Sequence, residues 1–113
     1  MQSSDLVPEK TNPQIEKEKY YIKRGVELLV NKINDPRAPI HKQIMTDVLE
    51  KRSVLYIYPC NHFWARLKSN YKYWRCAFRN QAYVNELLKS SNLPKNISAK
   101  INDRSIEIFN SSF

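Results

Sequence analysis

The sequence predicts a single α+β domain that is mostly helical, and three observations support this. The chain has 113 residues, which suits one domain with a modest core. Hydrophobic residues make up 42% of it, which argues against a disordered chain. Apolar residues recur at helical spacing in the first half and alternate at strand spacing near the C-terminus. We expect a compact domain at 13–109 between short tails at 1–12 and 110–113.

A first helix is predicted over residues 13–34. Asn12 suits the N-cap, and Pro13 suits the first helical position, where its missing N–H needs no partner. An apolar stripe follows at helical spacing and consists of Ile15, Ile22, Val26, Leu29 and Ile33. Charged residues cover the opposite face. This stripe exceeds what so small a domain obviously needs to cover, which favours a homodimer or a partner protein at this helix.

A second helix and a strand are predicted between residues 40 and 58. The helical pattern begins at Ile40 and places Ile44, Met45, Val48 and Leu49 on one side. The segment 53–58 is dense in β-branched and aromatic residues and ends before Pro59, so we expect a short strand there. Asn61 then suits the cap of a short helix that buries Phe63, Trp64 and Leu67.

The most distinctive stretch is 51–85, which holds seven Lys or Arg, both Trp, five of the seven Tyr and no acidic residue. Its second half predicts a helix at 70–89. On such a helix Lys72, Arg75 and Arg79 share an arc of about 60°. Trp74 and Phe78 lie on the other side, which is expected to join the core. The alternative is a strand over 71–78, because Tyr, Trp and Phe also favour strands.

A β-hairpin is predicted at 96–109, with a two-residue loop at Asn102–Asp103. The predicted pairs are Ile101 with Arg104, Ala99 with Ile106, and Ile97 with Ile108. This register places five apolar residues on one face and Ser98, Lys100, Ser105 and Glu107 on the other. An isolated hairpin is marginally stable in water, so the strand at 53–58 is expected to complete a three-stranded sheet.

From residue 40 onward, the order of helix, strand, short helix, basic helix and hairpin is that of a winged helix. The predicted architecture is therefore winged-helix-like with an extra N-terminal amphipathic helix. The run Asn70–Arg79 loosely resembles the recognition helix of the ETS family in its Asn-Tyr start and Ala-hydrophobic-Arg end, but it lacks a second arginine. Tyr73–Cys76 resembles WRC-type zinc modules, whose further Cys and His ligands are absent. Neither resemblance assigns the chain to a family.

The charge of the chain predicts an anionic partner. A net charge of +8 and a pI near 9.6 suit nucleic acid, an acidic protein or anionic lipid. We expect non-enzymatic binding of nucleic acid, DNA rather than RNA, in the form of a double-stranded DNA-binding domain related to transcription. Cations of the basic helix, the hairpin and the preceding segment are assigned to it: Lys72, Arg75, Arg79, Lys100, Arg104, Arg66 and Lys68. The alternative function is a protein-interaction subunit of a larger nuclear or ribonucleoprotein assembly.

Enzymatic chemistry is not predicted. Gly25 is the only glycine, whereas phosphate-binding loops and dinucleotide folds need several. Zinc is disfavoured although thiol and imidazole groups are present at Cys60, His62, Cys76 and His41, because Cys-x-His is not a usual chelating spacing. We expect no cofactor and no metal, and we expect both cysteines to be free thiols in the core.

Tyrosines offer a different contact with nucleic acid, namely stacking on unpaired bases. The candidates are Tyr56, Tyr58, Tyr71, Tyr73 and Tyr83, although tyrosines more often belong to the core or a half-buried surface.

No stretch approaches the roughly 18 apolar residues of a membrane span, and the N-terminus does not resemble a signal peptide. The expected location is intracellular, nuclear in a eukaryote, without membrane contact.

Overall fold

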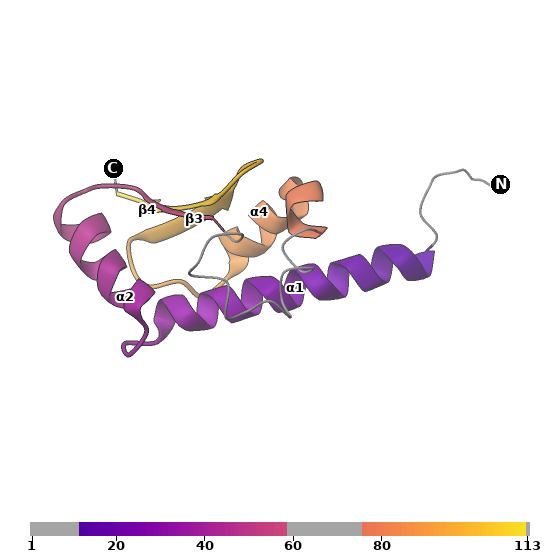
Figure 1. The fold of residues 1–113 in the computed structure, drawn as a ribbon, viewed down its shortest axis with the longest axis horizontal. Coiled ribbons are helices and arrows are strands. Elements are labelled where there is room, and N and C mark those ends of the chain that lie inside the picture. The colour runs from indigo at the N-terminus through magenta and orange to yellow at the C-terminus, as the bar shows by residue number, and fades with distance from the viewer. Residues whose placement is uncertain (1–11, 59–75, 113) are drawn as a thin grey trace.

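The computed structural model describes residues 12–58 and 76–112 of the chain. The fold is α+β, mostly helical, with one three-stranded antiparallel sheet, which confirms the predicted class at that level. A long helix, α1 (Asn12–Asn34), runs along one side of the protein. A shorter helix, α4 (Gln81–Ser90), contacts both α1 and the sheet and lies between them (Figure 1).

Helix α1 confirms the first predicted helix. The apolar stripe along it is buried, with Ile22, Leu29 and Ile33 almost inaccessible to solvent. Helices α4 and α2 contact α1 and help to cover this stripe. The apolar surface from Ile22 to Ile33, which favoured a partner at this helix, therefore packs into the protein's own core.

The second predicted helix is present in two consecutive parts. Helix α2 (Pro39–Gln43) continues directly into a π-helix, η1 (Ile44–Glu50). Their apolar sides bury Ile40, Ile44 and Val48, and η1 contacts two strands of the sheet. The chain then turns because Ser53 donates both its N–H and its hydroxyl to the carbonyl oxygen of Asp47, at 3.1 and 2.7 Å.

The sheet consists of β2 (Leu55–Ile57), β3 (Ile97–Ile101) and β4 (Ile106–Asn110), in the order β2-β4-β3. The strand predicted at 53–58 thus pairs with one hairpin strand, as expected. The face toward the helices carries the buried residues Ile57, Ile97, Ala99, Ile101, Ile106 and Ile108. The sheet and the helices therefore enclose a single apolar core.

The predicted register of the hairpin is wrong by two residues. Ile101 pairs with Ile106 rather than with Arg104, and Ala99 pairs with Ile108. The loop therefore has four residues, 102–105, because the Asn102 side chain accepts from the N–H groups of Arg104 and Ser105, both at 2.8 Å. A shift of two residues preserves the sorting of side chains between the faces. Ser105 is the exception, because it lies buried in the loop and not on the polar face of a strand.

The predicted single helix at 70–89 is wrong, because the chain breaks its helical path at Asn80. Residues 76–79 are helical, Asn80 has φ −132° and ψ 53°, and α4 begins at Gln81. The Asn80 side-chain amide donates to the carbonyl oxygen of Cys76 at 2.9 Å and to the carboxylate of Glu18 on α1 at 3.2 Å. These two bonds hold the break in place against α1.

The described end of the alternative strand at 71–78 is helical, since Cys76, Ala77 and Phe78 lie in the short helical segment. Cys76 is a free, buried thiol, as predicted, and Phe78 packs partly buried against the core. The short helix predicted after Asn61 lies outside the described residues.

Candidate nucleic-acid interface

Lys100 lies on the face of β3 that points away from the core. Strand alternation places it there, because Ala99 and Ile101 on either side of it are buried. Its ammonium group lies 5.8 Å from the ring centroid of Phe109 on β4, within the range of a cation–π contact. The side chain of Lys100 is exposed, so its charge remains available to a phosphate group.

Arg104 occupies the four-residue hairpin loop. Its backbone N–H donates to the side-chain oxygen of Asn102, which positions the residue, while its side chain is exposed. The amide nitrogen of Asn102 also donates to Glu107 at 2.7 Å, so one asparagine organises the loop and the base of β4. A cation on such a loop positions a nucleic-acid backbone without reading its sequence.

Arg79 ends the short helical segment at 76–79, and its side chain is exposed. One terminal nitrogen of its guanidinium lies 3.7 Å from the sulfur of buried Cys76, a contact that leaves the other donors of the guanidinium directed elsewhere. Cys76 and Ala77 anchor this segment in the core. The residue is therefore held at the surface by its neighbours in the chain.

Arg79 and the hairpin loop lie toward the same end of the molecule. Asn85 of α4 bonds the backbone of Ile101, the last residue of β3, so the loop is beside the first half of α4. Arg79 lies two residues before the start of α4 at Gln81, with Asn80 between them. Figure 1 shows the tip of the hairpin and the short helical segment at one end of the sheet.

None of these three cations forms an ion pair with an acid in the described part of the chain, although Glu107 lies opposite Lys100 in the strand pairing. Ion pairs in this part of the chain join Arg24 to Glu27, Arg37 to Asp35, and Lys51 to Asp47, at 3.3 to 3.4 Å. Each of these pairs links residues close in sequence on the surface. Arg79, Lys100 and Arg104 therefore retain charge for an anionic partner.

Four of the predicted contact residues lie outside the described residues: Lys72, Arg75, Arg66 and Lys68. The arc that joins Lys72, Arg75 and Arg79 consequently stays a prediction. Helix α4, which the same prediction included, is fully described and does not present a basic face. Its exposed residues include Ala82, Glu86 and Lys89, one acid and one base, so this part of the segment is not a cationic surface.

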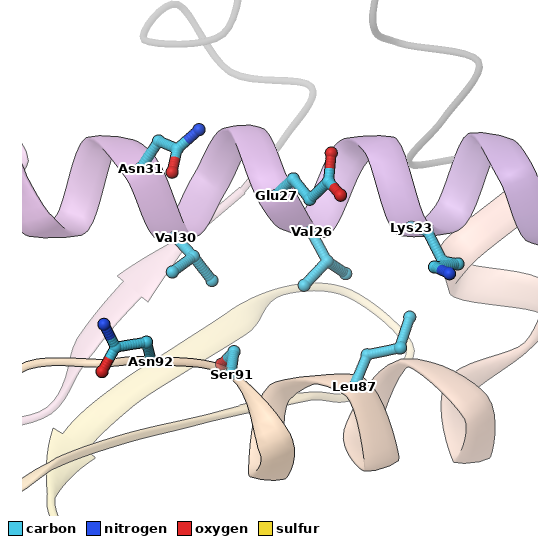
Figure 2. Close-up of a pocket in the computed structure, with 8 residues that line it drawn as sticks. All are labelled: Lys23, Val26, Glu27, Val30, Asn31, Leu87, Ser91 and Asn92. Atoms are coloured by element: carbon cyan, nitrogen blue, oxygen red, sulfur yellow. The ribbon is translucent and has the colours of Figure 1, made fainter.

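A groove of about 260 Å³ lies between α1 and the C-terminal half of α4. Figure 2 shows Val26 and Val30 on α1 facing Leu87 on α4, with Lys23 and Glu27 beside them on α1. The hydroxyl of Ser91, also in the lining, donates to the carbonyl oxygen of Leu88 at 2.7 Å. The groove thus offers apolar contact and a rim that carries both Lys23 and Glu27.

The zinc ligands considered from the sequence are only partly described. His41 directs Nδ1 to the carbonyl oxygen of Ile33, 2.7 Å away, and Cys76 is buried beside Arg79. Cys60 and His62 lie outside the described residues. Across 12–58 and 76–112 there is no group of three metal-ligating side chains.

The sequence named Tyr56 and Tyr58 as candidates for stacking, but it did not reveal the surface that they share with Phe109, the solvent face of the sheet. Tyr56 is 49% and Tyr58 is 42% exposed, and both follow the strand alternation that directs Ile57 into the core. Phe109 lies on the same face of the middle strand. The alternation of Leu55-Tyr-Ile-Tyr58 and Ile106-Glu-Ile-Phe-Asn110 contains this information, but only the pairing of β2 with β4 shows that the two runs adjoin.

No protein family, no curated protein and no solved structure matches the chain. Among the described helices, none combines the length and the apolar composition that a membrane crossing requires.

Proposed function

We propose that the protein is a non-enzymatic nucleic-acid-binding domain that contacts a double-stranded backbone with Arg79, Lys100 and Arg104. The observation that supports this most directly is the placement of Arg79 and the hairpin loop toward one end of the molecule, without acidic partners for the three cations in the described part of the chain. Arginine offers several donors in a fixed plane, which suits phosphate oxygens.

The charge of the whole chain supports the same function. The net charge is +8, and the stretch 51–85 contains no acidic residue. Lys72 and Arg75 precede Arg79 within that stretch, so in this proposal they extend the contact along the same polymer. Such an interface neutralises phosphates and releases counterions, and its affinity therefore falls steeply with salt.

The topology supports a winged-helix-like arrangement. Strand β2 pairs with β4, the second strand of the hairpin. Helix α2 and η1 precede β2, and α4 precedes the hairpin. In this proposal the hairpin is the wing that lies against the nucleic-acid backbone, while residues 70–79 approach a groove. Helix α4 packs against the hairpin on the core side of the sheet. In this proposal it does not enter the nucleic-acid groove, because it contacts both α1 and β3.

The alternative of a protein-interaction subunit has less support after the fold is known. It drew on the apolar stripe of α1, and the part of that stripe from Ile22 to Ile33 is buried inside the chain. We therefore place nucleic-acid binding first.

The test is the salt dependence of affinity for a fluorescein-labelled duplex, measured by anisotropy. The variant Arg79→Ala with Arg104→Ala removes two proposed phosphate contacts and is expected to reduce the log–log slope by about 1.8, or about 0.9 per contact. The matched control, Arg37→Ala with Lys42→Ala, removes the same charge from exposed residues near the start of α2. It should change the slope far less.

An equal loss in both variants would show that net charge alone determines binding. An unchanged slope in the Arg79 and Arg104 variant would remove these residues from the interface. Circular dichroism of each variant at the same temperature checks that the fold is retained.

A further inference from the structure

The outer face of the sheet presents aromatic rings where a small antiparallel sheet commonly presents polar groups to solvent. Tyr56 and Tyr58 on or next to β2 are 49% and 42% exposed, and Phe109 on β4 is partly exposed. The opposite face of the sheet already forms the core. The folding of this domain therefore does not account for the rings on the outer face.

The register places these rings on the same face of the sheet. Tyr56 is directly opposite Glu107, so Phe109 is its diagonal neighbour across the pair of β2 and β4. Diagonal neighbours are about 7 to 8 Å apart, within reach of aromatic side chains. Tyr58 is two residues further along the same face, about 7 Å away. The three rings thus share one face of the sheet, here called the aromatic patch, and Glu107 lies on that face as well.

A cation lies within this patch. Lys100 is opposite Glu107 on the other side of β4, and its ammonium group lies 5.8 Å from the centroid of the Phe109 ring. The carboxylate of Glu107 accepts a bond of 2.7 Å from Asn102, which draws it toward the hairpin loop. Lys95 and Arg104 are exposed near opposite ends of β3 and add positive charge around the patch.

We propose that this outer face binds unpaired bases of single-stranded nucleic acid. Tyr56 and Tyr58 provide ring faces on which bases stack, Phe109 completes the apolar floor, and Lys100 contacts a phosphate. Aromatic rings interleaved with cations are the arrangement that single-strand-binding proteins use, because every base has a π-face and every nucleotide a negative charge. The inference rests on the proposed function, because it too concerns nucleic acid. It shares Lys100 with the proposed duplex contact and adds the aromatic rings of the sheet face.

The test compares affinities for a labelled single strand of twelve thymidines and for a labelled duplex of the same length. The variant Tyr56→Leu with Tyr58→Leu keeps apolar bulk and removes the rings. It is expected to weaken single-strand binding about tenfold or more, since base stacking on an aromatic residue contributes about that factor. Duplex binding should change less than twofold.

Two matched variants show whether the rings themselves are responsible. Tyr56→Phe with Tyr58→Phe keeps the stacking faces and should bind the single strand as the wild type does. Tyr20→Leu removes a tyrosine on α1 that is 62% exposed, and it should have no effect. A loss of affinity for both polymers in the leucine variant, or no loss for either, would overturn the proposal.

A second measurement uses the wild-type chain and does not depend on the folding of any variant. A single strand containing 5-bromouracil is cross-linked by light and the adducts are mapped by mass spectrometry. Adducts at Tyr56, Tyr58 or Phe109 are expected, and adducts confined to other residues would contradict the proposal. If the wild type binds the duplex but no single strand, this inference fails while the proposed function stands. If it binds only the single strand, the proposed duplex binding fails while this inference stands.

Discussion

Asn85 and Ile101 are joined by both polar atoms of one amide. The side-chain oxygen of Asn85 accepts from the N–H of Ile101 at 2.8 Å, and its nitrogen donates to the carbonyl oxygen of Ile101 at 3.4 Å. Ile101 is at the end of β3, an edge strand of the sheet, where backbone groups lack a neighbouring strand. A single helical side chain thus completes the edge of the sheet and attaches α4 to the hairpin.

Replacement of Asn85 by alanine is expected to lower the free energy of unfolding by about 1 to 3 kcal/mol, because the partly buried N–H of Ile101 loses its partner. Urea denaturation followed by circular dichroism measures this. Lys89→Ala, an exposed substitution on the same helix, should stay within about 0.5 kcal/mol of the wild type. Equal stability of the two variants would mean that water replaces the Asn85 contact without cost.

Replacement of Asn102 by alanine is expected to destabilise the hairpin by about 1 to 3 kcal/mol. The variant leaves the N–H groups of Arg104 and Ser105 without the acceptor that closes the loop. Thermal unfolding measures the loss, and hydrogen exchange at Ile101 and Ile106 localises it. Asp103→Ala, in the same loop, is the control, and it should leave exchange at these two amides unchanged.

Replacement of Ile108 by alanine tests the core between the sheet and the helices. Its side chain is completely buried at the centre of β4. The expected loss is about 2 to 5 kcal/mol, which combines lost burial with the cavity left behind. Val54→Ala, just before β2 on the exposed side, should cost less than about 1 kcal/mol. A small effect at Ile108 in guanidinium unfolding would contradict the described packing.

The turn between α1 and α2 contains an acid, Asp35, whose pKa the fold lowers. The backbone N–H of Arg37 donates to the Asp35 carboxylate at 3.0 Å, and the Arg37 side chain donates to it at 3.3 Å. Both bonds lower the pKa of Asp35 from its ordinary 3.8, and the backbone bond has the larger effect. The charged form is favoured in the folded state. Its contribution to stability is therefore complete above about pH 4, where the unfolded chain is also ionised, and is lost as the pH falls through the lowered pKa.

Carbon-13 NMR of the Asp35 carboxyl group should give a midpoint below 3.8. Arg37→Ala removes only the side-chain bond and should raise this midpoint part of the way back. A midpoint at or above the ordinary value in the wild type would show that the turn is open in solution.

Local pattern predicted much of the fold and less of the site. The helix at 13–34 and the strand at 53–58 were predictable because periodicity and capping residues are properties of consecutive residues. The break at Asn80 was not, because it is held by Glu18, which is 62 residues away in the chain. Arg79, Lys100 and Arg104 are exposed, and their contact with nucleic acid stays a prediction, while the prediction of one continuous helix over 70–89 was wrong.

The amino-acid order by itself determined which side chains face inward, since alternation in the hairpin and the three-to-four spacing in α1 depend only on local geometry. Tertiary contact decided two further features: the helix break at Asn80, which Glu18 of α1 holds in place, and the placement of Tyr56 and Phe109 on neighbouring strands. The physical reason is that a two-residue slip of a strand preserves its faces. Specific side-chain bonds select one register from the alternatives that the pattern allows: those of Asn102 within the hairpin loop and those of Asn85, on α4, to Ile101.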